Sequence, residues 1–170
     1  MRQNHFELFQ LQPRFGIDLA QLERAYREVQ NQVHPDKFVT AGTAEQRVAM
    51  QWATHANTAY QTLKNPLKRA TYLCELNGVD LQAESNTAMP VAFLMQQMEW
   101  RERLDDVRSD LTGVQELESA LREVRNHLLA QIGRQLDNAE FQDAAQSIRQ
   151  LMFLEKFNDD LDRVTDQLVQ

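Results

Sequence analysis

The triplet His34-Pro35-Asp36 holds the side chains of this sequence that are best placed to do chemistry. An imidazole offers a hydrogen-bond donor and an acceptor on one ring, and a carboxylate accepts charge-assisted hydrogen bonds. His–Asp pairs also orient nucleophiles in hydrolases. Here the two residues share one tight loop, and neither Ser nor Cys stands beside them. The pattern therefore favours a binding role, with a small His-dependent hydrolase as the alternative.

Metal and redox chemistry have weak sequence support. The residues His5, His34, His55 and His127 show no paired ligand spacing, and Cys74 is the only cysteine. A single cysteine excludes an internal disulfide and a Cys-x-x-Cys site. We expect Cys74 to be a small buried thiol on a helix. We therefore expect no metal site, no cofactor and no catalytic residue, and we expect that the protein is not an enzyme.

Two helices must position the triplet, one on each side of it. Asp18 should cap the first helix, which should stop before Pro35 because proline disfavours helix at the preceding residue. Thr43 and Gln46 have capping-box spacing and predict the start of the second helix. Helices of this length joined by one loop should form an antiparallel hairpin. Their expected inward positions are Leu19, Leu22, Tyr26, Val29 and Val33, then Val48, Trp52, Ala56, Ala59 and Leu63.

A second helical region is expected after a linker at residues 77–89. Pro90 should open its first helix, and Thr112-Gly113 should separate that helix from the next. Short connections between three helices predict an antiparallel bundle over residues 90–170. The apolar positions expected in its core are Phe93, Trp100, Leu104, Val107, Leu111, Val114, Leu117, Leu121, Val124, Leu128, Ile132, Leu136, Ala144, Ile148, Leu151, Leu154, Phe157, Leu161, Val164 and Leu168. The fold class predicted for the whole chain is all-α.

Composition and charge narrow the class of protein further. The 170 residues include 42% hydrophobic residues and only 5 Gly and 4 Pro, which indicates packed helical domains. Residues 1–76 contain 9 Lys and Arg against 7 Asp and Glu, whereas residues 77–170 contain 9 against 18. The acidic second half argues against nucleic-acid binding. The sequence contains no run of about 18 apolar residues that would predict a membrane span, and no apolar signal core follows the N-terminus. We therefore expect a cytoplasmic protein.

The N-terminal region resembles the J-domain over residues 4–76. The resemblance rests on Tyr26-Arg27, on His34-Pro35-Asp36-Lys37-Phe38, and on Asn57, Ala59, Tyr60, Leu63 and Asn65-Pro66. In that family the loop engages an ATP-bound chaperone of the DnaK type and triggers its ATP hydrolysis. The chaperone-binding residues that the resemblance implies are His34, Pro35, Asp36, Lys37, Arg24 and Arg27.

Similarity to one branch of the J-proteins extends over nearly the whole chain. It includes Leu63-Lys64-Asn65-Pro66-Leu67-Lys68-Arg69-Ala70, Tyr72-Leu73, Asn77-Gly78-Val79-Asp80, Phe93-Leu94-Met95, Glu99 and Arg101-Glu102. These residues are similar to the HscB family, the co-chaperones of iron–sulfur cluster assembly. The resemblance implies a J-domain at 1–76, a scaffold-binding domain at 90–170, and two partners, the DnaK-like ATPase HscA and the scaffold IscU. A general J-protein that presents unfolded clients is the alternative.

The helix opened by Pro90 also carries a mixed stripe away from its core side. Phe153 lies about 200° around its own helix from Leu151, at ~100° per residue, and is expected to be exposed as well. Apolar residues among carboxylates indicate an adaptable binding surface, although packing of Leu94 and Met98 in the bundle or under the J-domain is an alternative. The expected scaffold-binding residues are Leu94, Met95, Met98, Glu99, Glu102, Asp106 and Phe153.

Overall fold

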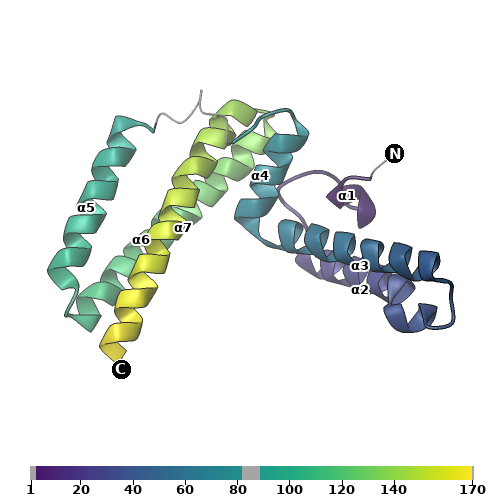
Figure 1. Ribbon diagram of the computed structural model, residues 1–170. Helices are drawn as coiled ribbons and strands as arrows, with labels where there is room; N and C mark the ends of the chain where they lie inside the picture. Colours follow the sequence, from purple (N-terminus) through teal and green to yellow (C-terminus); the bar gives the residue numbers. More distant parts are fainter. Residues whose placement is uncertain (1–2, 82–88, 170) are drawn as a thin grey trace. The chain divides into compact units, whose positions relative to one another are not determined.

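The computed structural model describes residues 3–81 and 89–169, and every regular element in those ranges is helical, as expected (Figure 1). Contacts between residues divide the chain into two compact units, Met1–Leu73 and Cys74–Gln170. The first unit holds α1 (His5–Leu8), α2 (Leu19–Val33), the 3₁₀ helix η1 (Pro35–Phe38), α3 (Thr43–Lys64) and most of α4 (Pro66–Leu76). The second unit holds α5 (Val91–Val107), α6 (Leu111–Asp137) and α7 (Phe141–Val169).

In the first unit, α2 and α3 form the expected hairpin (Figure 1). Asp18 caps α2 because its carboxylate accepts hydrogen bonds from the backbone N–H groups of Ala20 at 2.9 Å and Gln21 at 3.3 Å. The expected inward positions at the start of each helix were wrong, since Leu19 on α2 and Val48 and Trp52 on α3 are all exposed. Small alanines take the inward positions of α3 and let the helices approach closely. The buried residues of α3 are Ala49, Ala56, Ala59 and Leu63.

A buried arginine on α4 holds the connection between α1 and α2 in place. The guanidinium of Arg69 donates to the carbonyl oxygens of Phe15 at 2.8 Å and Leu63 at 2.6 Å. It also lies over the Phe15 ring, 4.8 Å from the ring centroid. The carbonyl of Leu63 belongs to the last turn of α3, where backbone acceptors lack helical partners. Arg69 therefore joins the loop before α2 to the end of α3.

The second unit is a bundle of α5, α6 and α7, with the longest packed interface between α6 and α7 (Figure 1). Phe93 and Trp100 of α5 face α7, where their rings meet Phe153 at 6.2 Å and Phe157 at 6.1 Å between centroids. Most of the expected core positions are buried. The exceptions are Leu111, which is exposed, and Val107, Val124 and Leu168, which are half-buried. Over the described residues, none of the helices has the length and apolar character needed to cross a bilayer.

The division between the units falls earlier than the expected domain end at residue 76. Val79 and Leu81 are buried, and the guanidinium of Arg149 donates to the Leu81 carbonyl at 3.3 Å. The Cys74 thiol lies 3.8 Å from the Phe141 carbonyl, and burial raises the pKa of this thiol to about 11. Residues 74–81 thus pack with the second unit, while 82–88 of the expected linker lie outside the described residues. A buried, protonated thiol agrees with a structural role for Cys74.

The turn between α5 and α6 lies earlier in the chain than expected, at residues 108–110. Asp110 caps α6 by accepting the backbone N–H of Thr112 at 3.1 Å, so the helix begins at Leu111 and Gly113 lies inside it. The expected break at Thr112-Gly113 was therefore wrong, since α6 begins three residues earlier than Val114. A Cβ atom on Gly113 would stand 2.6 Å from Val107 Cγ1 and 2.8 Å from Val107 Cβ. Glycine at this position lets the end of α5 pack against the start of α6.

We predict that Gly113→Ala destabilises the second unit by about 1–2 kcal/mol. Alanine normally stabilises a helix by about 1 kcal/mol relative to glycine, but overpacking costs about 1–3 kcal/mol, and here Val107 cannot move its Cβ atom away. Thermal unfolding measures the change. Ser119→Ala, an exposed change on the same helix, should leave stability unchanged or slightly raised. The double variant Val107→Ala/Gly113→Ala should recover part of the loss, and equal stability of Gly113→Ala and wild type would contradict the packing argument.

Candidate functional site

The His34-Pro35-Asp36 loop lies at the end of the hairpin, and its side chains are exposed. His34 ends α2 in an extended conformation, with φ −59° and ψ 130°, as proline requires of the residue before it. Its Nδ1 accepts the backbone N–H of Asp36 at 3.3 Å, and its carbonyl accepts the N–H of Lys37 at 3.0 Å. Because Nδ1 is the acceptor, the neutral ring carries its proton on Nε2. The loop therefore presents an N–H donor and the Asp36 carboxylate outward on a short 3₁₀ turn.

Gln46 holds the segment that follows the triplet. Its Nε2 lies 3.0 Å from the Phe38 carbonyl, 3.2 Å from the Ala41 carbonyl and 3.4 Å from the Val39 carbonyl. The expected capping box with Thr43 was wrong, because Gly42 is the N-cap residue of α3 and makes no side-chain cap. Gln46 therefore uses its amide to satisfy loop carbonyls. The spacing between Thr43 and Gln46 is visible in the sequence, but the loop carbonyls that accept hydrogen bonds from Gln46 are visible only in the structure.

The family motif residues on α2 and α3 join the two helices below the loop. The rings of Tyr26 and Tyr60 stack at 4.2 Å with an interplanar angle of 9°. The hydroxyl of Tyr26 donates to Asn57 Oδ1 at 3.3 Å and accepts a hydrogen bond from Gln30. These contacts fix the position of α2 against α3, and so fix the base of the loop.

The basic surface beside the loop is weaker than the sequence alone suggested. Arg24, Arg27 and Lys37 are all exposed, as expected for a docking surface. However, the Arg27 guanidinium makes an ion pair with Glu23 one turn earlier on α2. The charge of Arg27 is thus partly balanced before any partner arrives.

The geometry of the His34-Pro35-Asp36 loop does not support a catalytic role. His34 Nδ1 stands 3.6 Å from Asp36 Oδ2, but the Asp36 side chain is 86% exposed. A carboxylate that orients a catalytic histidine is normally buried, so that its charge is not screened by water. Among the described residues, no group of three His, Cys, Asp or Glu side chains could hold a metal ion.

The exposed side of α5 carries the second candidate site. Met95 and Met98 are 60% and 62% exposed, Leu94 is 43% exposed, and Glu99, Glu102 and Asp106 are exposed as well. The alternative in which Leu94 and Met98 pack inside the bundle is therefore wrong. Val91, at 72% exposed, extends the same apolar surface by one turn and was missed in the sequence, although it lies three residues before Leu94.

Phe153 is less exposed than expected. It is half-buried, its ring meets the edge of Phe93, and the guanidinium of Arg101 lies 5.8 Å from its centroid. The reason is that α5 lies against this side of α7, a tertiary contact that the periodicity of α7 alone does not reveal. Phe153 thus lies between the two helices, with Phe93 and Arg101 as its contacts on α5. We call the surface formed by Val91, Leu94, Met95, Met98, Glu99, Glu102, Asp106 and Phe153 the mixed face.

Comparison with known proteins identifies the class. The C-terminal part of the chain, residues 89–162, matches the family model described as the HSCB C-terminal oligomerisation domain. The chaperone HscB from Vibrio cholerae superposes with a TM-score of 0.87 at 38% identity, covering 98% of this chain and 99% of that one. Human co-chaperone HscB superposes with a TM-score of 0.89 at 25% identity, covering 94% and 81%. The hairpin with its His-Pro-Asp loop is thus the J-domain of a co-chaperone, followed by a helical bundle.

Full-length relatives give the family. A co-chaperone protein HscB homolog from Burkholderia mallei is 51% identical over 170 residues, which is 99% of this chain and 97% of the relative. A homolog of the same description from Cupriavidus taiwanensis is 51% identical over 171 residues. The chain belongs to the HscB family of co-chaperones, which agrees with the expectation that it is not an enzyme.

We predict that Gln46→Ala loosens the loop without unfolding the hairpin. Loss of the amide leaves the carbonyls of Phe38 and Ala41 to water, at a cost of about 0.5–1.5 kcal/mol. Hydrogen exchange should become faster at the Lys37 and Ala41 amides. Gln46→Glu should act in the same way, because a carboxylate cannot donate to these carbonyls. Gln51→Ala, an exposed change on the same helix, is the control, and unchanged exchange in both Gln46 variants would refute the role of this residue.

Proposed function

We propose that this protein binds the iron–sulfur cluster scaffold IscU, delivers it to the DnaK-like chaperone HscA and stimulates the ATPase of that chaperone. The observation that carries the proposal is the exposed His-Pro-Asp loop on a rigid hairpin, joined to a bundle with an exposed apolar surface. Membership of the HscB family supports both partners. The proposed place of action is the cytoplasm, where the chaperone has ATP.

The loop is suited to engage another protein because it needs little ordering. Pro35 removes backbone freedom, and the contact of Asp36 N–H with His34 Nδ1 fixes the ring before docking. The Asp36 carboxylate can accept a bidentate pair from an arginine of the partner. Lys37 on η1 adds a positive charge that would steer the loop towards an acidic surface. These features support binding and triggering, with hydrolysis carried out by the partner's own residues.

The mixed face supports binding of a folded partner. Methionine side chains are flexible and polarisable, so Met95 and Met98 can adapt to an irregular apolar surface. The neighbouring carboxylates Glu99, Glu102 and Asp106 would act at the rim, mainly on association rate and salt dependence. Exposed apolar area of this kind is costly in water, and burial against a partner recovers about 25 cal/mol for each Å².

One assay separates the proposal from its alternatives. Purified HscA is mixed with the protein, and phosphate release is followed with and without the scaffold. The proposal expects stimulation that rises further when the scaffold is added. A general J-protein would be equally active with an unfolded client in place of the scaffold, and a hydrolase would be active without HscA.

We predict that His34→Gln reduces ATPase stimulation to the level of HscA alone. Glutamine cannot hold the ring geometry in which Nδ1 accepts the Asp36 amide and Nε2–H points outward. Circular dichroism should be unchanged, because His34 is exposed and lies on no buried stripe. The matched control is His127→Gln, an exposed histidine on α6. Full stimulation by His34→Gln would remove the loop from the mechanism.

We predict that Met98→Ala and Phe153→Ala each weaken scaffold binding without lowering the basal ATPase stimulation. Central apolar residues often cost about 2 kcal/mol on truncation, or roughly thirtyfold in affinity, as titration calorimetry would measure. Met50→Ala is the matched control, since Met50 on α3 is 63% exposed and Met98 is 62% exposed. Phe153→Ala also removes the contact with Phe93, so its thermal stability is measured alongside. Wild-type affinity in the Met98/Phe153 double variant would rule out the mixed face.

A further inference from the structure

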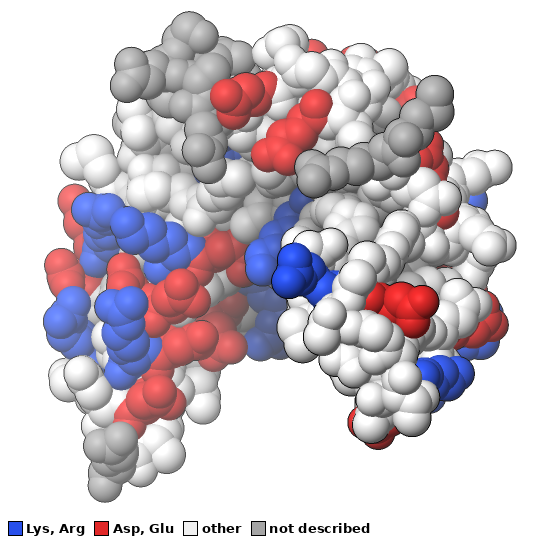
Figure 2. Space-filling model, turned by 45° about the vertical axis from the view of Figure 1, so that its right-hand side comes forward, with Lys and Arg blue, Asp and Glu red and all other residues white. Residues whose placement is uncertain are grey.

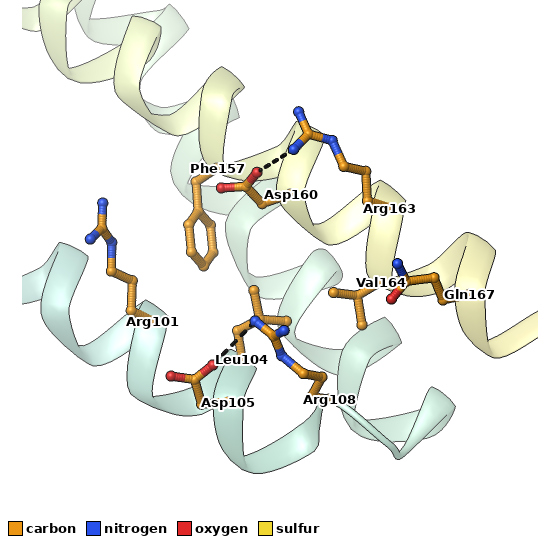
Figure 3. Close-up of a pocket in the computed structure, with 9 residues that line it drawn as sticks. All are labelled: Arg101, Leu104, Asp105, Arg108, Phe157, Asp160, Arg163, Val164 and Gln167. Carbon is orange, nitrogen blue, oxygen red and sulfur yellow. Dashed lines mark hydrogen bonds and ion pairs between the residues drawn. The ribbon is translucent and has the colours of Figure 1, made fainter.

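A pocket of about 500 Å³ lies between the C-terminal half of α5 and the C-terminal half of α7 (Figure 3). Its apolar floor is formed by Leu104, Phe157 and Val164. Three guanidinium groups stand around this floor, from Arg101 on α5, from Arg108 just after the end of α5, and from Arg163 on α7 (Figure 3). We call it the arginine pocket, and nothing in the assignment of the triplet or the mixed face uses it.

The positive charge in this pocket is unusual for its surroundings. Residues 77–170 contain 9 Lys and Arg against 18 Asp and Glu, and three of those nine line this one pocket, with only two carboxylates beside them. In the left-hand part of Figure 2, blue and red side chains lie close to one another on the surface. The lining of the arginine pocket therefore has one more positive than negative side chain, in a unit whose overall composition is acidic.

The two carboxylates of the pocket hold its arginines only weakly. Arg108 pairs with Asp105 at 3.3 Å, and Arg163 pairs with Asp160 at 3.3 Å, and in each pair the two residues are three positions apart in the sequence (Figure 3). All four side chains are at least half exposed, and such ion pairs contribute about 0.2–1 kcal/mol. An arriving carboxylate can therefore replace Asp105 or Asp160 at little cost. An arginine fork is well matched to a carboxylate because it can donate two parallel hydrogen bonds.

The arginine pocket and part of the mixed face share one side of α5. At about 100° per residue, Leu94, Met98, Arg101, Asp105 and Arg108 lie on one side of α5. Arg101 joins the two surfaces directly, since its guanidinium contacts the Phe153 ring and also lines the pocket. The apolar ring of Phe153 and the positive charges of the arginine pocket are thus adjacent through Arg101.

We propose that the arginine pocket receives a carboxylate of the scaffold protein, on a segment whose apolar side chains lie against Phe153 and Met98. This inference rests on the proposed function, since it names the chemistry by which the same partner is recognised. The apolar floor accommodates the aliphatic part of the segment, while Arg108 and Arg163 bind its negative charge. A basic segment is disfavoured there by the three guanidinium groups.

The first test neutralises the arginines at nearly constant size. In Arg108→Gln/Arg163→Gln, scaffold affinity by titration calorimetry should fall about tenfold or more, as expected for the loss of hydrogen bonds to a charged group. The salt dependence of binding should decrease as well. Arg122→Gln is the matched control, because Arg122 is a similarly exposed arginine on α6 that pairs with Glu118 at 3.3 Å. Circular dichroism checks that each variant is folded.

The second test changes the sign of the effect. In Asp105→Asn/Asp160→Asn the competing carboxylates are removed, so scaffold affinity should rise, by severalfold. If these ion pairs only stabilised the fold, scaffold binding would be weaker in the aspartate double variant as well as in the arginine double variant. Unchanged affinity in the arginine variant, or reduced affinity in the aspartate variant, would overturn the proposal.

Variants of the scaffold protein identify which of its carboxylates binds in the arginine pocket. A scaffold with an amidated C-terminus and scaffolds with single Asp→Asn or Glu→Gln changes are titrated against wild type and the arginine variant. Removal of the carboxylate that occupies the arginine pocket should weaken scaffold binding to the wild-type protein. The same removal should have no further effect on binding to the arginine variant. If no carboxylate couples in this way, the inference fails. If wild-type protein does not bind the scaffold at all, the proposed function fails first, so the two failures are distinct.

Discussion

The stacked rings of Tyr26 and Tyr60 are the interaction on which the J-domain loop depends. An exposed tripeptide has no core of its own, so its geometry must be set by the helices that enter and leave it. The tyrosine stack, with the hydrogen bond to Asn57, fixes α2 against α3 near the middle of the hairpin. Pro35 then ends α2, and Gln46 ties the returning chain to the start of α3. The loop is ordered from both sides while its own side chains remain free to meet a partner.

Helical periodicity was enough to predict the elements whose packing is set by one long apolar stripe, as in α6 and α7. It failed where apolar residues are adjacent in sequence. In α3, Val48 and Trp52 looked like core residues, yet Ala49 takes the inward position because two helices can approach closely only over small side chains. The same limit applies to Phe153, whose half-buried state depends on α5 lying against α7. Periodicity describes one helix and carries no information about its neighbour.

The candidate sites were predictable to different degrees for a related reason. The His-Pro-Asp loop is contiguous in sequence, so its residues and their order could be read directly. Most of the mixed face also follows from one helix, α5, whose apolar residues occupy more than one side. The arginine pocket could not be predicted, because Arg108 and Arg163 are 55 positions apart in the sequence and line one pocket only in the folded bundle. The spacing of Gln46 from Thr43 predicts a capping box. Its actual partners are carbonyls of the loop before α3, and the sequence does not reveal the course of that loop.

The acidic charge of the second unit gives the exposed apolar surface a physical setting. Val91, Met95 and Met98 present apolar area that would promote self-association in a neutral protein. Residues 77–170 carry twice as many Asp and Glu as Lys and Arg, so copies of this unit repel one another at a distance. Glu99 and Glu102 place part of that charge directly beside the methionines. A partner must therefore offer apolar contact and a favourable charge pattern together, which makes the surface selective as well as adhesive.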